Sequence, residues 1–135
     1  MRPSSTGLAL IALACVLSLT GCGGENEDAR TSLEMPVFED EALMAGRGVW
    51  LGTCRACHLL GVAGAPAVTD FAQWDQRLPK GKELLYQSAL NGIQGEDGKY
   101  RMPPRGGNDR LTEEQVRLAV DYKIAAVEAL KGQSQ

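Results

Sequence analysis

The sequence of 135 residues contains a single histidine, His58. A site that needs two imidazole ligands from this chain is therefore excluded. A long apolar segment is also missing: the apolar run from Leu8 to Leu19 has twelve residues, too few to span a bilayer. Neither sign of charge dominates, because 14 Lys and Arg stand against 17 Asp and Glu. This balance argues against binding to nucleic acid.

The amino terminus has the pattern of an export signal. Arg2 is the only charge before the apolar run, and the run ends in Leu19-Thr20-Gly21-Cys22. These four residues resemble a bacterial lipobox, in which the chain is cut before the cysteine and a lipid is attached to its thiol. We predict a lipoprotein signal peptide over residues 1–21 and lipidation at Cys22. An ordinary signal peptide that is cleaved nearby is the alternative.

Acidic residues are concentrated between residues 23 and 41, where seven of them stand against Arg30 alone. Because the stretch has few apolar residues, it cannot bury enough surface to fold alone. We predict a flexible acidic tether over residues 22–38, a folded domain over 39–131 and a tail over 132–135. Export and lipidation together predict a bacterial periplasmic protein anchored to a membrane. Gly23 after the lipidated cysteine slightly favours the outer membrane, by analogy with enteric sorting rules.

The most specific motif is Cys54-Arg55-Ala56-Cys57-His58. Two thiols at this spacing, followed directly by a histidine, are typical of c-type haem attachment. We predict one covalent haem c held through Cys54 and Cys57, with His58 as the proximal iron ligand. A zinc site fits less well because it needs four ligands, usually from two separated pairs. A redox dithiol would need a βαβ setting, which is absent, and a disulfide need not be invoked.

A second iron ligand is predicted at Met102, in the segment Met102-Pro103-Pro104-Arg105-Gly106-Gly107. The two prolines restrict the backbone and the two glycines permit a sharp turn, so the loop can hold a side chain rigidly. Met44 on the first helix and Met35 in the tether are weaker candidates. Without the haem motif, a methionine would be expected to fill the core. A thioether ligand raises the reduction potential and favours electron transfer over oxygen activation.

Helical periodicity surrounds the motif. The segment before Cys54 is helical, residues 72–77 form a short helix that places Trp74 to cover the haem, and residues 82–91 form another. The last helix begins with a capping box of Thr112 and Gln115. We expect Tyr122 on this helix to lie near Gly46 and Trp50 on the first. No strand is predicted, so the fold class is all-α, with about three to five short helices.

Together these segments resemble class I cytochromes c, and among them the short bacterial cytochrome c-five subgroup. The resemblance is carried by Gly46 and Trp50, the motif 54–58, Gly64-Ala65-Pro66, Ser88-Ala89-Leu90-Asn91-Gly92, the segment 102–107 and Ala119-Val120-Asp121-Tyr122. It implies crossed terminal helices, and a Pro66 carbonyl that accepts a hydrogen bond from Nδ1 of His58. One departure follows Gly107, where Asn108-Asp109-Arg110 replaces the extra cysteine pair that is frequent in the subgroup.

The predicted function is that of a membrane-tethered electron carrier, not an enzyme, which moves single electrons between respiratory partners. Basic residues near the methionine could ring the haem edge and meet a partner's acidic face, although solvated loop charges would give the same pattern. These residues are Lys99, Arg101, Arg105 and Arg110. Two alternatives are a haem subunit of a larger oxidase or dehydrogenase, and a haem sensor or enzyme with a displaceable sixth ligand.

Overall fold

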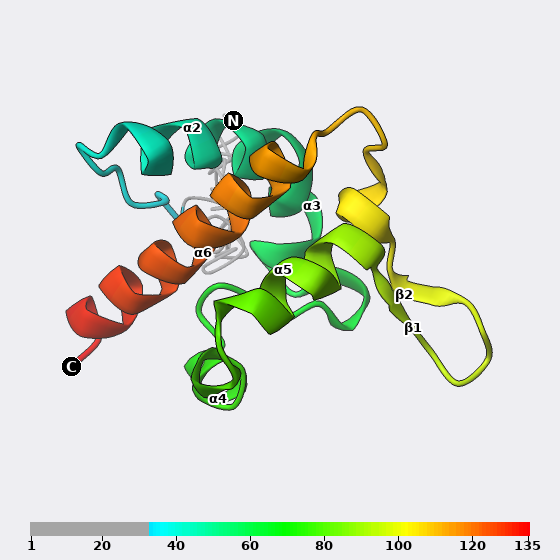
Figure 1. The fold of residues 1–135 in the computed structure, drawn as a ribbon. Coiled ribbons are helices and arrows are strands. Elements are labelled where there is room, and N and C mark those ends of the chain that lie inside the picture. The colour runs from blue at the N-terminus through cyan, green and yellow to red at the C-terminus, as the bar shows by residue number, and fades with distance from the viewer. Residues whose placement is uncertain (1–32) are drawn as a thin grey trace, which may run out of the picture.

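The structure is a computed structural model that describes residues 33–135. The predicted signal peptide, Cys22 and residues 22–32 of the predicted tether lie outside the described residues. The helices are α2 (Glu41–Val49), α3 (Arg55–His58), α4 (Phe71–Asp75), α5 (Lys82–Asn91) and α6 (Glu113–Gln133) (Figure 1). A π-helical turn, Trp50–Cys54, joins α2 to α3, and 3-10 turns cover Val62–Gly64, Leu78–Lys80 and Pro104–Gly107. Within this part of the chain, no helix is long and apolar enough to cross a bilayer.

The helices α2 and α6 cross at Gly46 (Figure 1). A Cβ atom on Gly46 would lie 2.6 Å from the carbonyl carbon of Leu118 and 3.1 Å from Cβ of Tyr122, so only glycine permits this approach. The rings of Trp50 and Tyr122 pack beside it with their centroids 5.9 Å apart. The predicted contact of Gly46, Trp50 and Tyr122 and the crossing of the terminal helices are confirmed.

The predicted start of the last helix is confirmed in detail. The backbone N–H of Gln115 donates to Oγ1 of Thr112 at 3.2 Å, and the N–H of Thr112 donates to Oε1 of Gln115 at 2.9 Å. Glu113 and Glu114 follow in the first turn, where the helix dipole favours acidic side chains. The helix expected over residues 82–91 is α5, and the short helix expected over 72–77 is α4, one residue earlier at its start.

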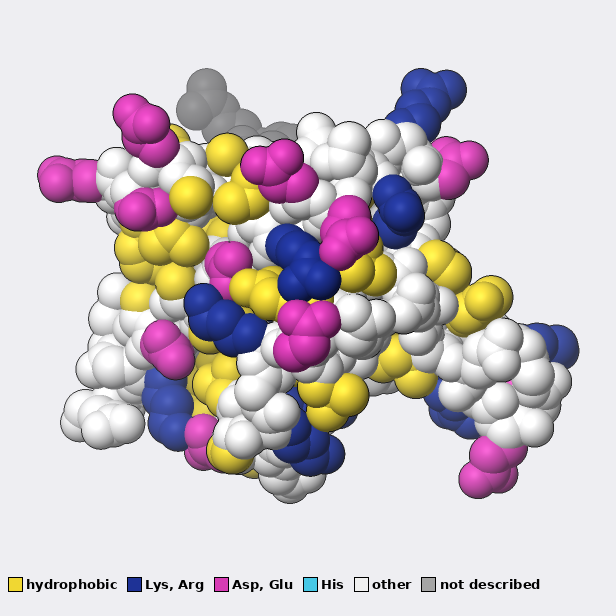
Figure 2. Space-filling view, viewed as in Figure 1, with side chains coloured by type: hydrophobic (Ala, Val, Ile, Leu, Met, Phe, Trp, Pro, Cys, Tyr) yellow, Lys and Arg dark blue, Asp and Glu magenta, His cyan; other side chains and the backbone are white. Residues whose placement is uncertain are grey.

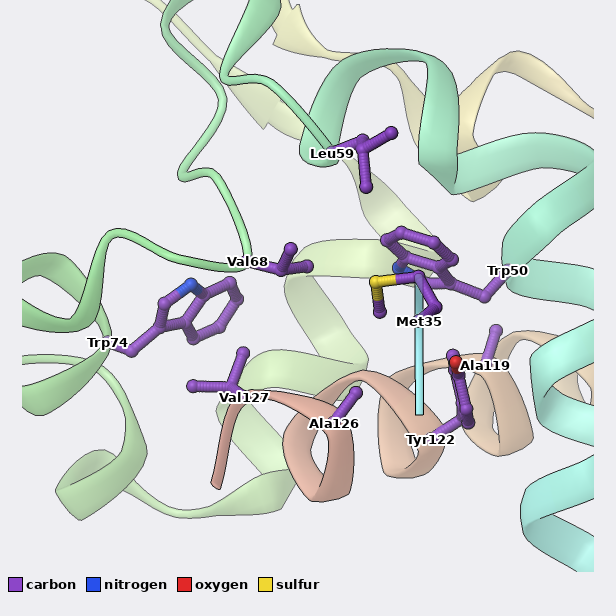
Figure 3. Close-up of a cluster of buried hydrophobic side chains, with 9 residues drawn as sticks. All are labelled: Met35, Trp50, Leu59, Val68, Trp74, Ala119, Tyr122, Ala126 and Val127. Carbon is purple, nitrogen blue, oxygen red and sulfur yellow. The ribbon is translucent and has the colours of Figure 1, made fainter. Parts of the chain in front are cut away.

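The hydrophobic core begins before α2, because residues 33–38 pack against the crossing helices. Met35 is 5% exposed and lies among the core side chains with Trp50 and Tyr122 (Figure 3). The hydroxyl of Tyr122 donates to the Pro36 carbonyl at 2.9 Å, and Phe38 meets the Tyr122 ring edge-on. We predicted residues 22–38 as a flexible tether, but within its last six residues Leu33, Met35 and Phe38 pack against the core, while Val37 stays exposed.

A short hairpin interrupts the helical structure between α5 and α6. Strands β1 (Ile93–Gln94) and β2 (Tyr100–Met102) pair antiparallel, with Ile93 opposite Met102 (Figure 1). The prediction of no strand is wrong here, because strands this short leave no alternating pattern in a sequence. The fold class is nevertheless confirmed, since helices form the rest of the regular structure and supply the core.

Replacing Gly46 by alanine should lower the free energy of unfolding by about 1–3 kcal/mol, because the added Cβ forces the two packed helices apart. Gly48→Ala is the matched control in the same helix, since a Cβ there meets nothing within 4 Å. The control should raise the free energy of unfolding by up to about 1 kcal/mol through helix propensity. Chemical denaturation measures both values, and equal changes in the two variants would contradict a tight contact at Gly46.

Candidate functional site

The residues of the cysteine motif lie on one continuous helical segment formed by the π turn and α3. The N–H of Arg55 donates to the carbonyl of Trp50, five residues earlier, which widens the helix before the motif. Both cysteines are free thiols; Cys54 is half-buried and Cys57 is exposed. They are three residues apart and thus share one face of the helix, as attachment to a single group requires.

His58 follows on the same helix, and its ring is held in one orientation. Its side chain is buried, and Nδ1 lies 3.0 Å from the carbonyl oxygen of Pro66. Because a carbonyl only accepts hydrogen bonds, Nδ1 carries the proton and Nε2 keeps a free electron pair. The N–H of Val68 also donates to the His58 carbonyl at 2.9 Å, which fixes the returning chain. The structure thus contains the contact that the resemblance implied for Pro66.

The electrostatic environment keeps this imidazole neutral near neutral pH. Burial, followed by the positive charge of Lys123, lowers the pKa of His58 to about 4. Burial also raises the pKa of the Cys54 thiol. A neutral imidazole with a free Nε2 is the form that donates an electron pair to a metal.

The side chains do not form a metal site by themselves. Within residues 33–135, no three His, Cys, Asp or Glu side chains converge on a point that could hold a metal ion. The alternative of a zinc half-site therefore has no support in this region. One free nitrogen donor and two free thiols on one helix face fit a haem, whose porphyrin brings four further nitrogens to the iron.

The segment after Met102 turns sharply back towards the cysteines. Arg105, Gly106 and Gly107 all have positive φ angles, of 54°, 65° and 83°, and the guanidinium of Arg105 donates to the Leu111 carbonyl. The two glycines therefore adopt positive φ angles and form the sharp turn that the sequence predicted.

This segment packs on the residue that precedes Cys54. A Cβ on Gly106 would lie 3.0 Å from Cγ2 of Thr53, and Nδ2 of Asn108 donates to Oγ1 of Thr53 at 3.3 Å. The structure thus brings the methionine loop, some fifty residues later in the sequence, against the helical segment that carries the thiols.

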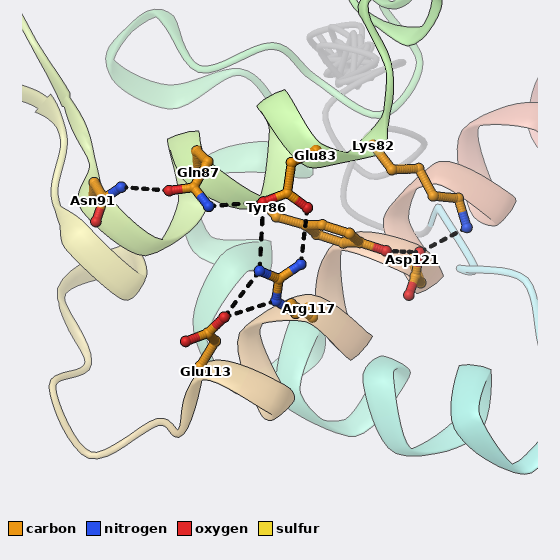
Figure 4. Close-up of polar contacts among 8 residues, drawn as sticks. All are labelled: Lys82, Glu83, Tyr86, Gln87, Asn91, Glu113, Arg117 and Asp121. Atoms are coloured by element: carbon orange, nitrogen blue, oxygen red, sulfur yellow. Dashed lines mark hydrogen bonds and ion pairs between the residues drawn. The ribbon is translucent and has the colours of Figure 1, made fainter.

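The end of α5 supports Met102 from the other side. A Cβ on Gly92, which has a φ of 76°, would lie 2.6 Å from the Met102 carbonyl oxygen and 2.8 Å from the Pro104 nitrogen. Helix α5 itself is held on α6 by polar contacts (Figure 4). These are the hydrogen bond from Tyr86 to Asp121 at 2.6 Å and the ion pairs Lys82–Asp121 and Arg117–Glu83. A further ion pair within α6, from Arg117 to Glu113, orients the Arg117 side chain.

The other described methionines are placed differently. Met35 is buried in the core with Trp50 and Tyr122, and Met44 is 43% exposed on α2. Met102 is half-buried at the end of β2, beside the segment that packs on Thr53. Met102 is therefore neither packed in the core like Met35 nor exposed on a helix surface like Met44.

Trp74 is buried on α4, and its Nε1–H donates to the Ala67 carbonyl at 2.7 Å. It thus fixes the loop that also carries Pro66. The ammonium group of Lys123 lies 4.5 Å from the centroid of its ring.

Lys123 is a buried residue that the sequence reasoning missed. Its position gave a signal, because it lies four residues after Ala119 and four before Val127, both on the buried face of α6. A lysine at such a position is unusual, since lysine is almost never fully buried unless it is paired.

Comparison with known proteins supplies the context of this site. Residues 41–122 match the family described as cytochrome C oxidase, cbb3-type, subunit III. The chain is 36% identical over 91 residues to cytochrome c-555 of Prosthecochloris aestuarii. The aligned region covers 66% of this chain and 92% of that protein. It is 39% identical over 80 residues to cytochrome c-555 of Chlorobaculum tepidum, covering 59% of this chain and 72% of the relative. A chain in the crystal structure of an electron transfer complex of nitrite reductase with cytochrome c is also similar. It has 36% sequence identity and a TM-score of 0.53, with coverage of 62% of this chain and 94% of that one.

Gly92→Ala should destabilise the protein more than Gly98→Ala. Both glycines have a positive φ, so each substitution carries backbone strain of about 1–3 kcal/mol. Only at Gly92 does the added Cβ also overlap Met102 and Pro104, whereas the space at Gly98 is open. Denaturant unfolding followed by circular dichroism measures the difference. The same loss at both positions would mean that Gly92 does not support the methionine segment.

Proposed function

The chain belongs to the cytochrome c family, and from this premise we propose that it is a lipid-anchored periplasmic electron carrier with His58 and Met102 as axial ligands. It carries one haem c through Cys54 and Cys57 and is an electron carrier, not an enzyme. The bound haem supplies one-electron exchange at its iron. The protein's residues fix the ligands and control the charge around the site.

The observation that carries the proposal is the 3.0 Å contact between Nδ1 of His58 and the Pro66 carbonyl. It directs the free electron pair of Nε2 away from Pro66 and strengthens the donor. Pro66 holds the His58 ring, and Val68 binds the His58 carbonyl. Because both the ring and the backbone of His58 are fixed, little of the protein needs to move when an electron arrives. A small rearrangement suits fast electron transfer better than ligand exchange.

Met102 is proposed as the sixth ligand because its segment is the most constrained of the methionine positions. The prolines that follow it, the close approach of Gly92 and the packing of Gly106 on Thr53 all restrict its backbone. Met35 is committed to the core and Met44 lies on the surface, so neither competes. A thioether at this position favours the reduced state and excludes small molecules.

The proposed partners are redox proteins, since a similar cytochrome is found in an electron transfer complex with nitrite reductase. Basic side chains that remain exposed near the methionine loop are Lys99, Arg101 and Arg110. The guanidinium of Arg105 is engaged with the Leu111 carbonyl and contributes less. Acidic and basic side chains are mixed over α5 and α6 (Figure 2), so that face has no dominant charge. We therefore propose that the methionine loop is the surface that attracts an acidic face of the partner.

A second candidate is a haem subunit of a larger membrane complex. The family description, which refers to subunit III of a cbb3-type oxidase, favours it. The carrier and the subunit share the same haem site and differ only in whether a partner stays bound. Co-purification from detergent-solubilised membranes distinguishes them, because a carrier should elute alone.

The lipid anchor and periplasmic location are proposed from the lipobox that ends in Cys22. Leu33 is the first residue that packs on the domain, so residues 22–32 separate it from the proposed lipid. A chain of this length can extend about 35–40 Å. The domain would then reach partners near the membrane while remaining attached.

Met102→Ala should leave the haem covalently attached but open one coordination position. We expect loss of the near-infrared thioether-to-ferric band, binding of carbon monoxide by the reduced protein and a lower reduction potential. Met44→Ala on the exposed face of α2 is the control and should behave as the wild type. A redox titration with optical spectra measures these properties. An unchanged band and potential in Met102→Ala would rule out the assignment.

Cys22→Ala should release the protein from the membrane fraction, because the thiol that carries the lipid is removed. Cys15→Ala is the matched control, since this cysteine lies inside the predicted signal peptide and is lost on cleavage. Fractionation with immunoblotting and intact-mass analysis measures the outcome. Membrane association of the Cys22 variant equal to that of the control would refute lipid anchoring.

A further inference from the structure

Lys123 carries a cation into the interior of the domain without a matching anion. Its side chain is 9% exposed, and its ammonium nitrogen faces the Trp74 ring at 4.5 Å. Among residues 33–135, no carboxylate lies within ion-pair distance and no hydrogen bond engages it. A contact with an aromatic ring offsets only part of the cost of burying a charge.

A second cation, Arg77, follows α4, where its backbone N–H donates to the Trp74 carbonyl at 2.9 Å. Nη1 of Arg77 donates to the backbone carbonyl of Gln73 at 2.8 Å, and within the described residues it forms no ion pair. Burial and then the charge of Arg77 lower the pKa of Lys123 to about 7, and the charges of both residues lower that of His58. Both cations thus adjoin Trp74, whose Nε1–H donates to the Ala67 carbonyl next to Pro66, the residue that holds His58.

The acidic side chains at the two ends of α4 are engaged elsewhere. Asp70 accepts hydrogen bonds from the backbone and side chain of Gln73, at 3.2 and 2.6 Å. Asp75 pairs with Lys131 on the outer side of α6. Within residues 33–135, no carboxylate therefore pairs with either of these two cations.

We infer that the Lys123 ammonium forms an ion pair with one propionate carboxylate of the haem, with Arg77 beside it as a second cation. Lys123 faces the Trp74 ring, Trp74 donates to the Ala67 carbonyl, and the adjacent Pro66 carbonyl holds His58, so Lys123 lies on the side of the domain where a haem would be attached. A haem brings two carboxylates, which equal the two cations in number and are opposite to them in charge. The inference depends on the covalent haem and not on the Met102 ligand or the lipid anchor.

The pairing has a consequence for the iron. A negative charge near the haem stabilises the ferric state, so neutralising a propionate raises the reduction potential. Lys123 is thus a positioning residue that holds the haem edge and tunes its potential. Trp74 has a related role, because its ring lies against the ammonium and limits its orientation.

The test compares Lys123→Met with Lys131→Met in the mature haem-loaded protein. Methionine preserves much of the length of lysine and removes the charge, and both positions lie on α6. Lys131 is the control because it is only partly covered and pairs with Asp75 outside the core. At fixed pH and ionic strength, we expect a lower midpoint potential for Lys123→Met and a value close to wild type for Lys131→Met. Equal potentials in the two variants would overturn the inference.

A second measurement does not depend on the variant folding. In the reduced, diamagnetic wild-type protein, nuclear Overhauser contacts should link the Lys123 ε-methylene protons to the propionate methylene protons. Contacts of Lys123 with Trp74 alone would overturn the inference. If the wild-type protein lacked a covalent haem, the assignment to a cytochrome would fail instead, so the two failures are distinguishable.

Discussion

The backbones of α2 and α6 approach each other at Gly46 more closely than any side chain would permit, and the remaining structure is arranged around this crossing. Helix α2 continues directly through the π turn into the cysteine motif, so the crossing fixes the direction in which Cys54, Cys57 and His58 enter the domain. The same crossing sets the position of α6, and with it Tyr122 and Lys123. The Trp50 and Tyr122 rings fill the space next to Gly46, and Met35 covers them.

The proposed haem site combines a histidine ring held in one orientation with a buried lysine that has no carboxylate partner among residues 33–135. His58 is fixed by Pro66, and the loop that carries Pro66 is fixed in turn by the bond from Trp74 to Ala67. Trp74 also faces Lys123, so one indole ring connects the position of the proposed iron ligand with the charge near it. The two propionate carboxylates of a bound haem would balance the cations on this side of the domain.

The methionine segment depends on contacts that are far apart in sequence. It is supported by Gly92 at the end of α5, while Gly106 and Asn108 attach it to Thr53. The polar contacts between α5 and α6 hold that support in place, and burial with the neighbouring Asp121 raises the pKa of Tyr86 to about 12, so the phenol keeps its proton. The proposed sixth ligand is therefore positioned by several elements at once.

Local sequence patterns determined much of this protein. The cysteine motif, the capping box at Thr112 and Gln115 and helix α5 all depend on neighbouring residues, so they could be predicted from the chain alone. The tertiary structure alone decided the packing of residues 33–38, the β1–β2 pairing, the engagement of Arg105 and the burial of Lys123. Each of these depends on partners distant in sequence: Met35 is buried only because α6 lies against it, and Lys123 is buried only because α4 covers it. The sequence shows which residues can make such contacts. Which contacts form depends on the free energy of burying the surfaces against each other, and that depends on the tertiary fold.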